Sequence, residues 1–302
     1  MAAGAVVTVG TFDGVHRGHQ AVLAEITRRA RARGSESVVV TFDPHPLAVV
    51  NPGAVPPLLT LPPERHRLLE AAGVSRVETL PFTRELARLE PVQFVRDVLQ
   101  ARWHMAELVL GHDHGFGRGR SGDVDTVRRI ADSDGFAVDV VEAVKDEGQP
   151  ISSTLIRTAL AHGDIALARR WLGHPYGALG TVQRGAGRGR TIGVPTINLP
   201  VPDARKLLPP DGVYAVRVTL DDGARYGGMM NQGSRPTFGV SERGLEIHLF
   251  DVDAELYGRT VWVEWVSRLR DVRAFASREA LIEQLAEDRA AARRSLNGEG
   301  LA

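Results

Sequence analysis

The stretch AVVTVGTFDGVHRGH, residues 5–19, predicts the first strand, loop and helix start of an α/β unit. Its first five residues form a short apolar, β-branched run, which is typical of a buried strand. A glycine-containing loop follows, and after it residues 20–33 show helical periodicity. The apolar positions of that helix are Val22, Ile26 and Ala30.

Strand and helix patterns continue to alternate through the first half of the chain. Beta-branched runs predict further strands at residues 37–42, 107–110 and 137–141. Strands joined by helices favour a doubly wound, mainly parallel sheet, in which ligands bind beyond the carboxyl ends of the strands. Periodicity predicts the intervening helices at residues 63–72, 91–102, 124–133, 154–162 and 165–172.

The pattern changes near His174. Residues 174–203 are rich in Gly, Pro and Arg, and the segments after them read as strands separated by turns, which indicates an antiparallel sheet or barrel. We therefore predict two domains, residues 1–174 and 175–302. The predicted elements of the second are strands at 213–220, 224–230, 245–252 and 260–266 and a final helix at 278–296.

Composition excludes several kinds of chemistry. Lys plus Arg and Asp plus Glu both total 37, so no net positive charge favours nucleic acid or an anionic membrane. The chain has no cysteine, which rules out disulfides, thiolate catalysis and zinc–cysteine sites. No segment reaches the ~20 apolar residues of a membrane span, and the start lacks a signal peptide pattern. We expect a soluble cytoplasmic protein without nucleic-acid or membrane partners; its oligomeric state is not readable.

The loop after the first strand has the parts of a phosphate site. Glycines allow close backbone approach, and the helix start offers free N–H groups and the positive end of a dipole. His16 and His19 are three residues apart and share one helix face. Without a matching cysteine or carboxylate, donation of hydrogen bonds to phosphate is favoured over a zinc site or a surface histidine pair. The loop residues expected at the nucleotide are Gly10, Phe12, Asp13 and Gly14.

A second anchor is ISSTLIR, residues 151–157. Ser152 or Ser153 is suited to cap a helix, and Arg157 lies one turn further on, where a guanidinium can bind phosphate through two hydrogen bonds. Taken alone, this segment is better explained as an ordinary serine cap with a solvated arginine.

The second half contains its own candidate site. The loop RGAGRGR, residues 184–190, includes Gly185 and Arg190 and is either a phosphate-binding loop or a solvated basic linker. In the extended segment VPTIN, Thr196 and Asn198 point to one side, where two oxygens can meet Mg²⁺. Glu246 lies on the less apolar face of its predicted strand and is either a general base or a solvent-facing glutamate.

The combination of H-x-G-H at residues 16–19 with I-S-S-T-x-x-R at 151–157 resembles the nucleotidyltransferase superfamily. TFDPHP at 41–46 and GHDHGFGRGRSGD at 111–123 narrow the resemblance to the adenylyltransferase module of bacterial bifunctional riboflavin kinase/FAD synthetases. The resemblance implies a Rossmann-like domain in which Gly111 and Asp113 contact ATP and Asp43 and His45 contact flavin or nucleotide, although a tight turn also explains the last two. His114 stands where the family usually has phenylalanine, which puts local packing and ATP affinity in question.

The motifs of the second half follow the order of a riboflavin kinase: GRTIGVPTIN, NQGSRPTFG, LEIHLFD, AELYG and LRDVRAF. This resemblance implies a Greek-key β-barrel with a terminal helix. Thr196 and Asn198 would be the metal and phosphate residues and Glu246 the base for the riboflavin 5′-hydroxyl. The residues implied at the flavin include Arg235, Thr237, Arg270 and Phe275.

The expected activity is therefore double. The carboxyl-terminal domain would phosphorylate riboflavin with ATP and Mg²⁺, and the amino-terminal domain would adenylylate the FMN and release pyrophosphate. The partners would be small molecules: riboflavin, FMN and ATP. Two alternatives stay open, a chain with a single active half and a non-enzymatic flavin-binding regulator.

Overall fold

The computed structural model describes residues 4–112, 117, 122–185, 193–201, 203–237, 240–252 and 254–298, apart from the side chains of 234–237 and 240–243. The chain divides into two compact units, Met1–Ser153 and Thr154–Ala302. Each unit is described by itself.

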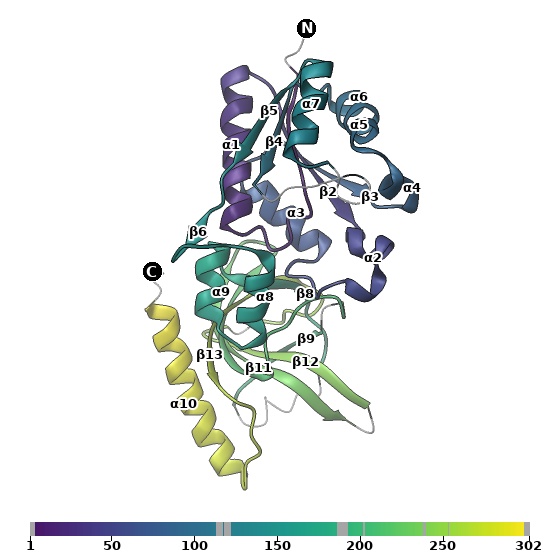
Figure 1. Ribbon diagram of the computed structural model, residues 1–302. Helices are drawn as coiled ribbons and strands as arrows, with labels where there is room; N and C mark the ends of the chain where they lie inside the picture. The colour runs from purple at the N-terminus through teal and green to yellow at the C-terminus, as the bar shows by residue number, and fades with distance from the viewer. Residues whose placement is uncertain are drawn as a thin grey trace. The chain divides into compact units, whose positions relative to one another are not determined.

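The first unit is built on a five-stranded parallel sheet in the order β3-β2-β1-β4-β5 (Figure 1). The chain moves outward from β1 to β2 and β3, then returns to the other side of β1 for β4 and β5. This arrangement confirms the predicted parallel sheet. The strands are β1 (Val6–Val9), β2 (Ser37–Asp43), β3 (Arg76–Pro81), β4 (Glu107–Gly111) and β5 (Ala137–Val141).

Helices cover both faces of this sheet because its strands are apolar on both sides. On one face, Val6 and Val39 pack against α1 (Arg17–Arg33) and α3 (Pro62–Ala71). On the other, Val7 and Val40 pack in a second cluster with the helical segment that follows β3 and with α7 (Val124–Asp134). That segment consists of α5 (Pro91–Gln93), the π-helical η2 (Phe94–Gln100) and α6 (Ala101–Trp103).

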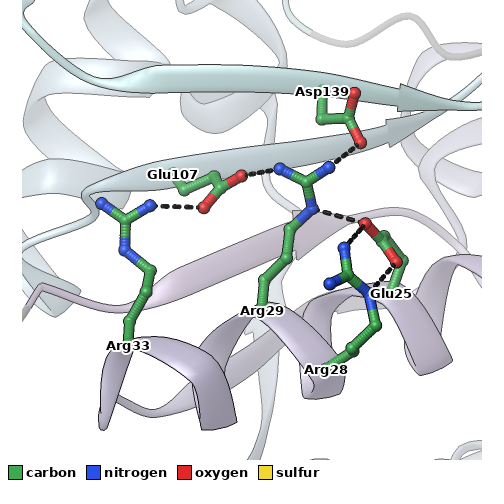
Figure 2. Close-up of polar contacts among 6 residues, drawn as sticks. All are labelled: Glu25, Arg28, Arg29, Arg33, Glu107 and Asp139. Carbon is green, nitrogen blue, oxygen red and sulfur yellow. Dashed lines mark hydrogen bonds and ion pairs between the residues drawn. The ribbon is translucent and has the colours of Figure 1, made fainter.

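Ion pairs fasten α1 to the amino ends of the strands (Figure 2). Glu107, the first residue of β4, is buried and bonds both Arg29 and Arg33 of α1. Arg29 also bonds Asp139 of β5 and Glu25. Hydrogen bonds lower the pKa of Glu25 to about 2, and those from Arg28 have the largest effect. The network lies at the end of the sheet opposite to the loop after β1.

The second unit contains a six-stranded antiparallel sheet in the order β8-β13-β10-β11-β12-β9. The sheet curls, so that its outer strands β8 and β9 approach each other. The Gln183 N–H, just after β8, donates to the Asn198 carbonyl at 2.8 Å, and Leu199 packs on Gly180. The strands are β8 (Tyr176–Thr181), β9 (Ile197–Pro200), β10 (Gly212–Leu220), β11 (Arg225–Thr237), β12 (Val240–Leu249) and β13 (Thr260–Arg270).

Helices complete the second unit. The terminal helix α10 (Arg278–Asn297) buries Ala292 against Met229 and Val266 of the sheet and against Phe250, just after β12. Two helices precede the sheet, α8 (Ser153–Ala161) and α9 (Ile165–Leu172). The connections carry α2 (Pro46–Val50), η1 (Pro52–Ala54), α4 (Arg84–Arg88), β6 (Lys145–Asp146) and β7 (Gln149–Pro150).

The sequence prediction missed β3, β8 and β9, and also the two-residue strands β6 and β7, which are too short for a periodic pattern. It also set the bounds of β12 wrongly. β3 is an edge strand in which only Leu80 is buried, so it lacks an apolar signal. The glycines of β8 weaken its strand pattern in the sequence. Packing requires glycine at position 177, because a Cβ there would lie 2.4 Å from the Trp262 ring. β9 was read only as an extended stretch. The strand predicted at 245–252 begins earlier, at Val240, and ends at Leu249, because Asp251 takes a left-handed conformation (φ 59°).

Candidate active sites

The loop Gly10–His16 lies at the carboxyl end of β1, beside the point where the strand order reverses between β1 and β4. Gly111 ends the neighbouring strand β4, and a Cβ placed on it would lie 3.8 Å from Val22 of α1. Two of the predicted glycine positions, Gly10 and Gly111, therefore lie at the same end of the sheet. In doubly wound sheets this end is the usual ligand site.

The loop holds an unusual backbone conformation. Phe12 and Val15 have positive φ values of 48° and 42°, which are uncommon for residues with a Cβ, and Gly14 has φ 83°. The Phe12 and Val15 side chains are buried in the cluster between α1 and the sheet. Packing therefore offsets the cost of the left-handed residues.

Asp13 ties this loop to the segment before α3. Its buried carboxylate accepts hydrogen bonds from the Leu59 N–H (3.0 Å), the Thr60 N–H (2.8 Å) and the Thr60 hydroxyl (3.1 Å). The Thr60 hydroxyl in turn accepts from the Gly14 N–H at 3.0 Å. This geometry makes Asp13 an anchor of the loop; sequence reasoning missed Thr60 because nothing in its surroundings marks it.

His16 and His19 lie together at the start of α1. His16 is the N-cap, and its Nδ1 accepts from the His19 N–H at 3.4 Å. The two rings stack with centroids 3.7 Å apart, and Phe12 meets His19 edge-on at 5.2 Å. Burial, and then the neighbouring His16, hold the pKa of His19 well below its usual value. His19 is therefore neutral at pH 7, and its buried Nδ1 has no hydrogen-bond partner among the described residues.

The second predicted anchor meets this loop directly. The Ser153 hydroxyl, at the start of α8, donates to the Asp13 carbonyl at 2.9 Å. The Ile151 carbonyl lies beside Gly18 of α1, 3.9 Å from where a Cβ would stand. Ser152 is half-buried next to them, whereas Arg157 is a half-buried residue of the second unit.

The TFDPHP segment ends the adjacent strand β2. Asp43 is its last residue, and His45 caps α2 through an Nδ1 that accepts from the Leu47 N–H at 3.2 Å. Buried Arg65 of α3 donates to the Phe42 carbonyl at 2.8 Å. Burial lowers the pKa of Arg65, while the charges of Asp13 and Asp43 oppose that shift. Sequence reasoning missed Arg65, because a charged residue on a helix is normally solvated.

The second unit contains four described residues of the predicted kinase site, on β12, on β9 and in the segments next to β9. β12 pairs with β9 so that Glu246 stands opposite Asn198, and opposite residues of antiparallel strands share a face. Asn198 is buried against Gly185: a Cβ on that glycine would lie 2.1 Å from the Asn198 amide nitrogen. Thr196 directly precedes β9 and is half-buried.

On its other side, Glu246 stands opposite exposed Asn231 of β11, a residue that the sequence did not single out. The next residue, Gln232, is buried and structural. Its amide donates to the Pro209 carbonyl at 2.5 Å and accepts from the Trp265 indole at 3.1 Å.

The two predicted flavin residues of the last loop pack beside α10. Arg270 bonds Asp288 of that helix through two nitrogens, at 2.9 and 2.7 Å, and Asp288 is buried. The Phe275 ring lies 5.7 Å from the Arg270 guanidinium and 5.1 Å from that of Arg273. Arg270 thus joins the end of β13 to α10.

Other predicted residues lie outside what the structure describes. These are Asp113, His114 and Arg190, together with the side chains of Arg235 and Thr237 on β11.

Metal-binding capacity is limited in the described part of the chain. There, no group of three or more His, Asp or Glu side chains is placed to hold an ion. Thr196 and Asn198 supply a hydroxyl and an amide oxygen, donors that suit Mg²⁺ when substrate phosphates complete the shell. The described residues also include no helix long and apolar enough to cross a membrane.

Comparisons with known proteins match both halves of the chain. Residues 1–155 match the FAD synthetase family and residues 172–296 the riboflavin kinase family. The bifunctional riboflavin kinase/FMN adenylyltransferase of Escherichia coli K12 is 38% identical over 96% of this chain and 92% of its own. That of Bacillus subtilis is 36% identical over 94% and 90%.

A solved structure agrees along the whole chain. The crystal structure of a Streptococcus pneumoniae protein described as a macrolide-efflux protein is 34% identical, with a TM-score of 0.86 over 97% of this chain and 95% of its own. On the strength of both domain matches and these relatives, the chain belongs to the bifunctional riboflavin kinase/FMN adenylyltransferase family.

Proposed function

We propose that this protein phosphorylates riboflavin to FMN in its second half and adenylylates FMN to FAD in its first, using ATP in both reactions. The observation that carries the proposal is that each family match contains its own polar cluster. Glu246 faces Asn198 in the riboflavin kinase match. In the FAD synthetase match, the stacked His16 and His19 follow the loop whose Asp13 carbonyl accepts a hydrogen bond from Ser153.

In adenylyl transfer, a phosphate oxygen of FMN attacks the α-phosphorus of ATP as the bond to pyrophosphate breaks. No covalent intermediate is needed, so catalysis rests on positioning and on neutralising charge. The N–H groups at the start of α1 and the imidazoles of His16 and His19 are suited to the triphosphate. Because the pKa of His19 is lowered, this residue acts as a neutral donor rather than as a cation.

Other residues complete the proposed adenylyltransferase site. Gly10 and Gly14 let the backbone approach the phosphates. Asp13 and Phe12 hold in place the loop that carries these glycines. We assign the domain to the Rossmann-like nucleotidyltransferases. The contacts proposed from the family resemblance are Gly111, Asp113, Ser152, Ser153 and Arg157 at ATP and Asp43 and His45 at the flavin.

In the kinase reaction, Glu246 takes the proton from the riboflavin 5′-hydroxyl as its oxygen attacks the γ-phosphorus of ATP and ADP leaves. Thr196 and Asn198 would hold Mg²⁺, which neutralises phosphate charge when bound. The curled sheet and α10 are proposed to form a Greek-key barrel with its terminal helix. The remaining proposed contacts are Gly185 and Arg190 at the phosphates and Arg235, Thr237, Arg270 and Phe275 at the flavin.

We place the boundary between the two catalytic domains near His174, giving 1–174 and 175–302. The two helices α8 and α9 fall largely between the family matches, which end at residue 155 and resume at 172. ATP, the co-substrate of both reactions, is a cytoplasmic metabolite, and we place the enzyme there.

One experiment tests both activities. The purified chain is incubated with Mg²⁺, ATP and either riboflavin or FMN, and the flavins are separated by chromatography. We expect FMN and FAD from riboflavin, and FAD from FMN. FMN without FAD would show that only the kinase half is active, and no product from either flavin would leave a binding protein without catalytic activity.

A further inference from the structure

We propose that His248 is a positioning residue of the kinase site: it holds the backbone of Pro195, next to the metal and phosphate residue Thr196. The inference rests on the proposed kinase function. It concerns a histidine on β12 two residues beyond the base Glu246 and on the same face of the strand.

The hydrogen bonds around His248 fix its tautomer. His248 is 7% exposed, and its Nδ1 lies 2.8 Å from the Pro195 carbonyl oxygen. A carbonyl only accepts, so Nδ1 carries the proton. Nε2 is then an acceptor, and the Arg289 Nη2 of α10 donates to it at 2.6 Å. The ring is thus a neutral bridge from α10 to the chain just before β9.

This bridge begins where the strand pairing stops. The register between β9 and β12 runs from Pro200, opposite Gly244, to Ile197, opposite Ile247. Thr196 and Pro195 lie beyond the last pair, and Pro195 itself is exposed. The bond from His248 is therefore the next attachment between β12 and this segment after the ladder ends, and it sets the path of the backbone that presents Thr196.

The surroundings favour the neutral ring. Burial, with the charges of Arg289 and Arg293, lowers the pKa of His248, against the opposing effects of the Pro195 carbonyl and Asp251. Phe250 meets the ring edge-on at 5.8 Å. Arg293 is bonded to Asp251 instead of to the histidine.

Three substitutions separate the two hydrogen bonds. His248→Asn keeps a donor near the place of Nδ1, His248→Gln keeps only a polar group near Nε2, and His248→Leu keeps neither. Arg293→Met is the matched control, since it removes a cation from the same helix without breaking a bond to His248. The readouts are kcat and KM for FMN formation, FAD formation from supplied FMN, and deuterium uptake of a peptide covering residues 195–199.

We expect kcat for FMN formation to fall about 10- to 100-fold in the Leu and Gln variants, because small misplacement of a site residue costs that much. The Asn variant is expected within about threefold of wild type, since the Pro195 bond is restored. Deuterium uptake of 195–199 should rise in the Leu and Gln variants alone. FAD formation from FMN should be unchanged in all of them, which also reports that the chain has folded.

Several results would overturn the inference. Wild-type kcat in the Leu variant would do so, as would equal losses in the Asn and Leu variants or a joint fall of both activities. If the wild-type chain forms no FMN at all, the proposed function fails instead. The deuterium uptake of 195–199 still tests the contact in that case, and unchanged uptake in the Leu variant would refute it.

Discussion

Glu246 and Asn198 face each other across the β12–β9 pair, although 48 positions separate them in the chain (246 minus 198). Their pairing places a carboxylate and a buried amide on one face of the curled sheet. Asn231 of β11 continues the row on the other side of Glu246. The candidate base thus lies in a polar strip whose composition is set by strand register.

Replacing Glu246 by Gln should abolish FMN formation, with a loss of at least about 100-fold, because the amide cannot accept the hydroxyl proton. FAD formation from supplied FMN should persist, since that reaction uses the other site. Glu283→Gln, at an exposed glutamate of α10 in the same unit, is the control and should keep both activities. Equal kinase rates in the two variants would remove Glu246 from the mechanism.

Gly185→Ala should lower kcat/KM for FMN formation about tenfold by displacing a site residue. The new Cβ would lie 2.1 Å from the buried Asn198 amide, so Asn198 or the loop must move. Gly53→Ala is the control, because a Cβ there meets no atom within 4 Å. Kinetics with ATP as the varied substrate measure the effect, and an unperturbed Gly185→Ala enzyme would contradict it.

Ser153→Ala should slow FAD formation about five- to tenfold while leaving riboflavin phosphorylation intact. The change removes the donor that binds the Asp13 carbonyl, and a lost hydrogen bond of this kind is worth about 1 kcal/mol. Ser133→Ala, at an exposed serine of α7, provides the comparison. Initial rates with FMN as substrate decide the matter, and a kinase defect in Ser153→Ala would point to general misfolding.

Stability of the first unit should depend on His19 at mildly acidic pH. Its folded-state pKa is depressed, so above pH 6.5 the residue is neutral in both states and contributes no difference. As the pH falls through 6.5, the unfolded chain binds a proton that the folded chain does not, and stability is lost. Urea unfolding at pH 7.5, 6.0 and 5.0 should show a smaller acid loss for His19→Asn than for wild type. The same replacement at exposed His66 of α3, in the same unit, serves as control, and matching acid losses in both variants would refute the assignment.

Glu107→Gln should destabilise the first unit by about 2–3 kcal/mol, since it leaves Arg29 and Arg33 without the buried carboxylate that they share. The loss stays below that of a fully buried pair because both arginines keep some contact with water. Glu25→Gln, in the outer part of the same network, should cost under about 1 kcal/mol. Urea unfolding compares the two, and equal losses would show that burial of Glu107 is unimportant.

The sequence predicted what depends on local pattern. A continuous apolar run predicted β1, and helical periodicity predicted α1 after its loop. Alternation along a later strand put Glu246 on its less apolar face. Strand register, and contacts between residues far apart in the chain, produce no local sequence pattern that would predict them. Thr60 lies in a short run without periodicity, yet it anchors Asp13. Trp262 fills the space where a side chain at position 177 would lie, so the chain has glycine there, and this glycine weakens the strand pattern of β8.

The left-handed residues Phe12 and Val15 have a kinetic consequence. Because their side chains are buried, the loop Gly10–His16 takes its conformation when the protein folds. A nucleotide therefore binds to a preformed loop. Association with the first unit should therefore proceed in one exponential phase whose rate rises linearly with ATP concentration, without the plateau that a slow rearrangement of the loop would impose.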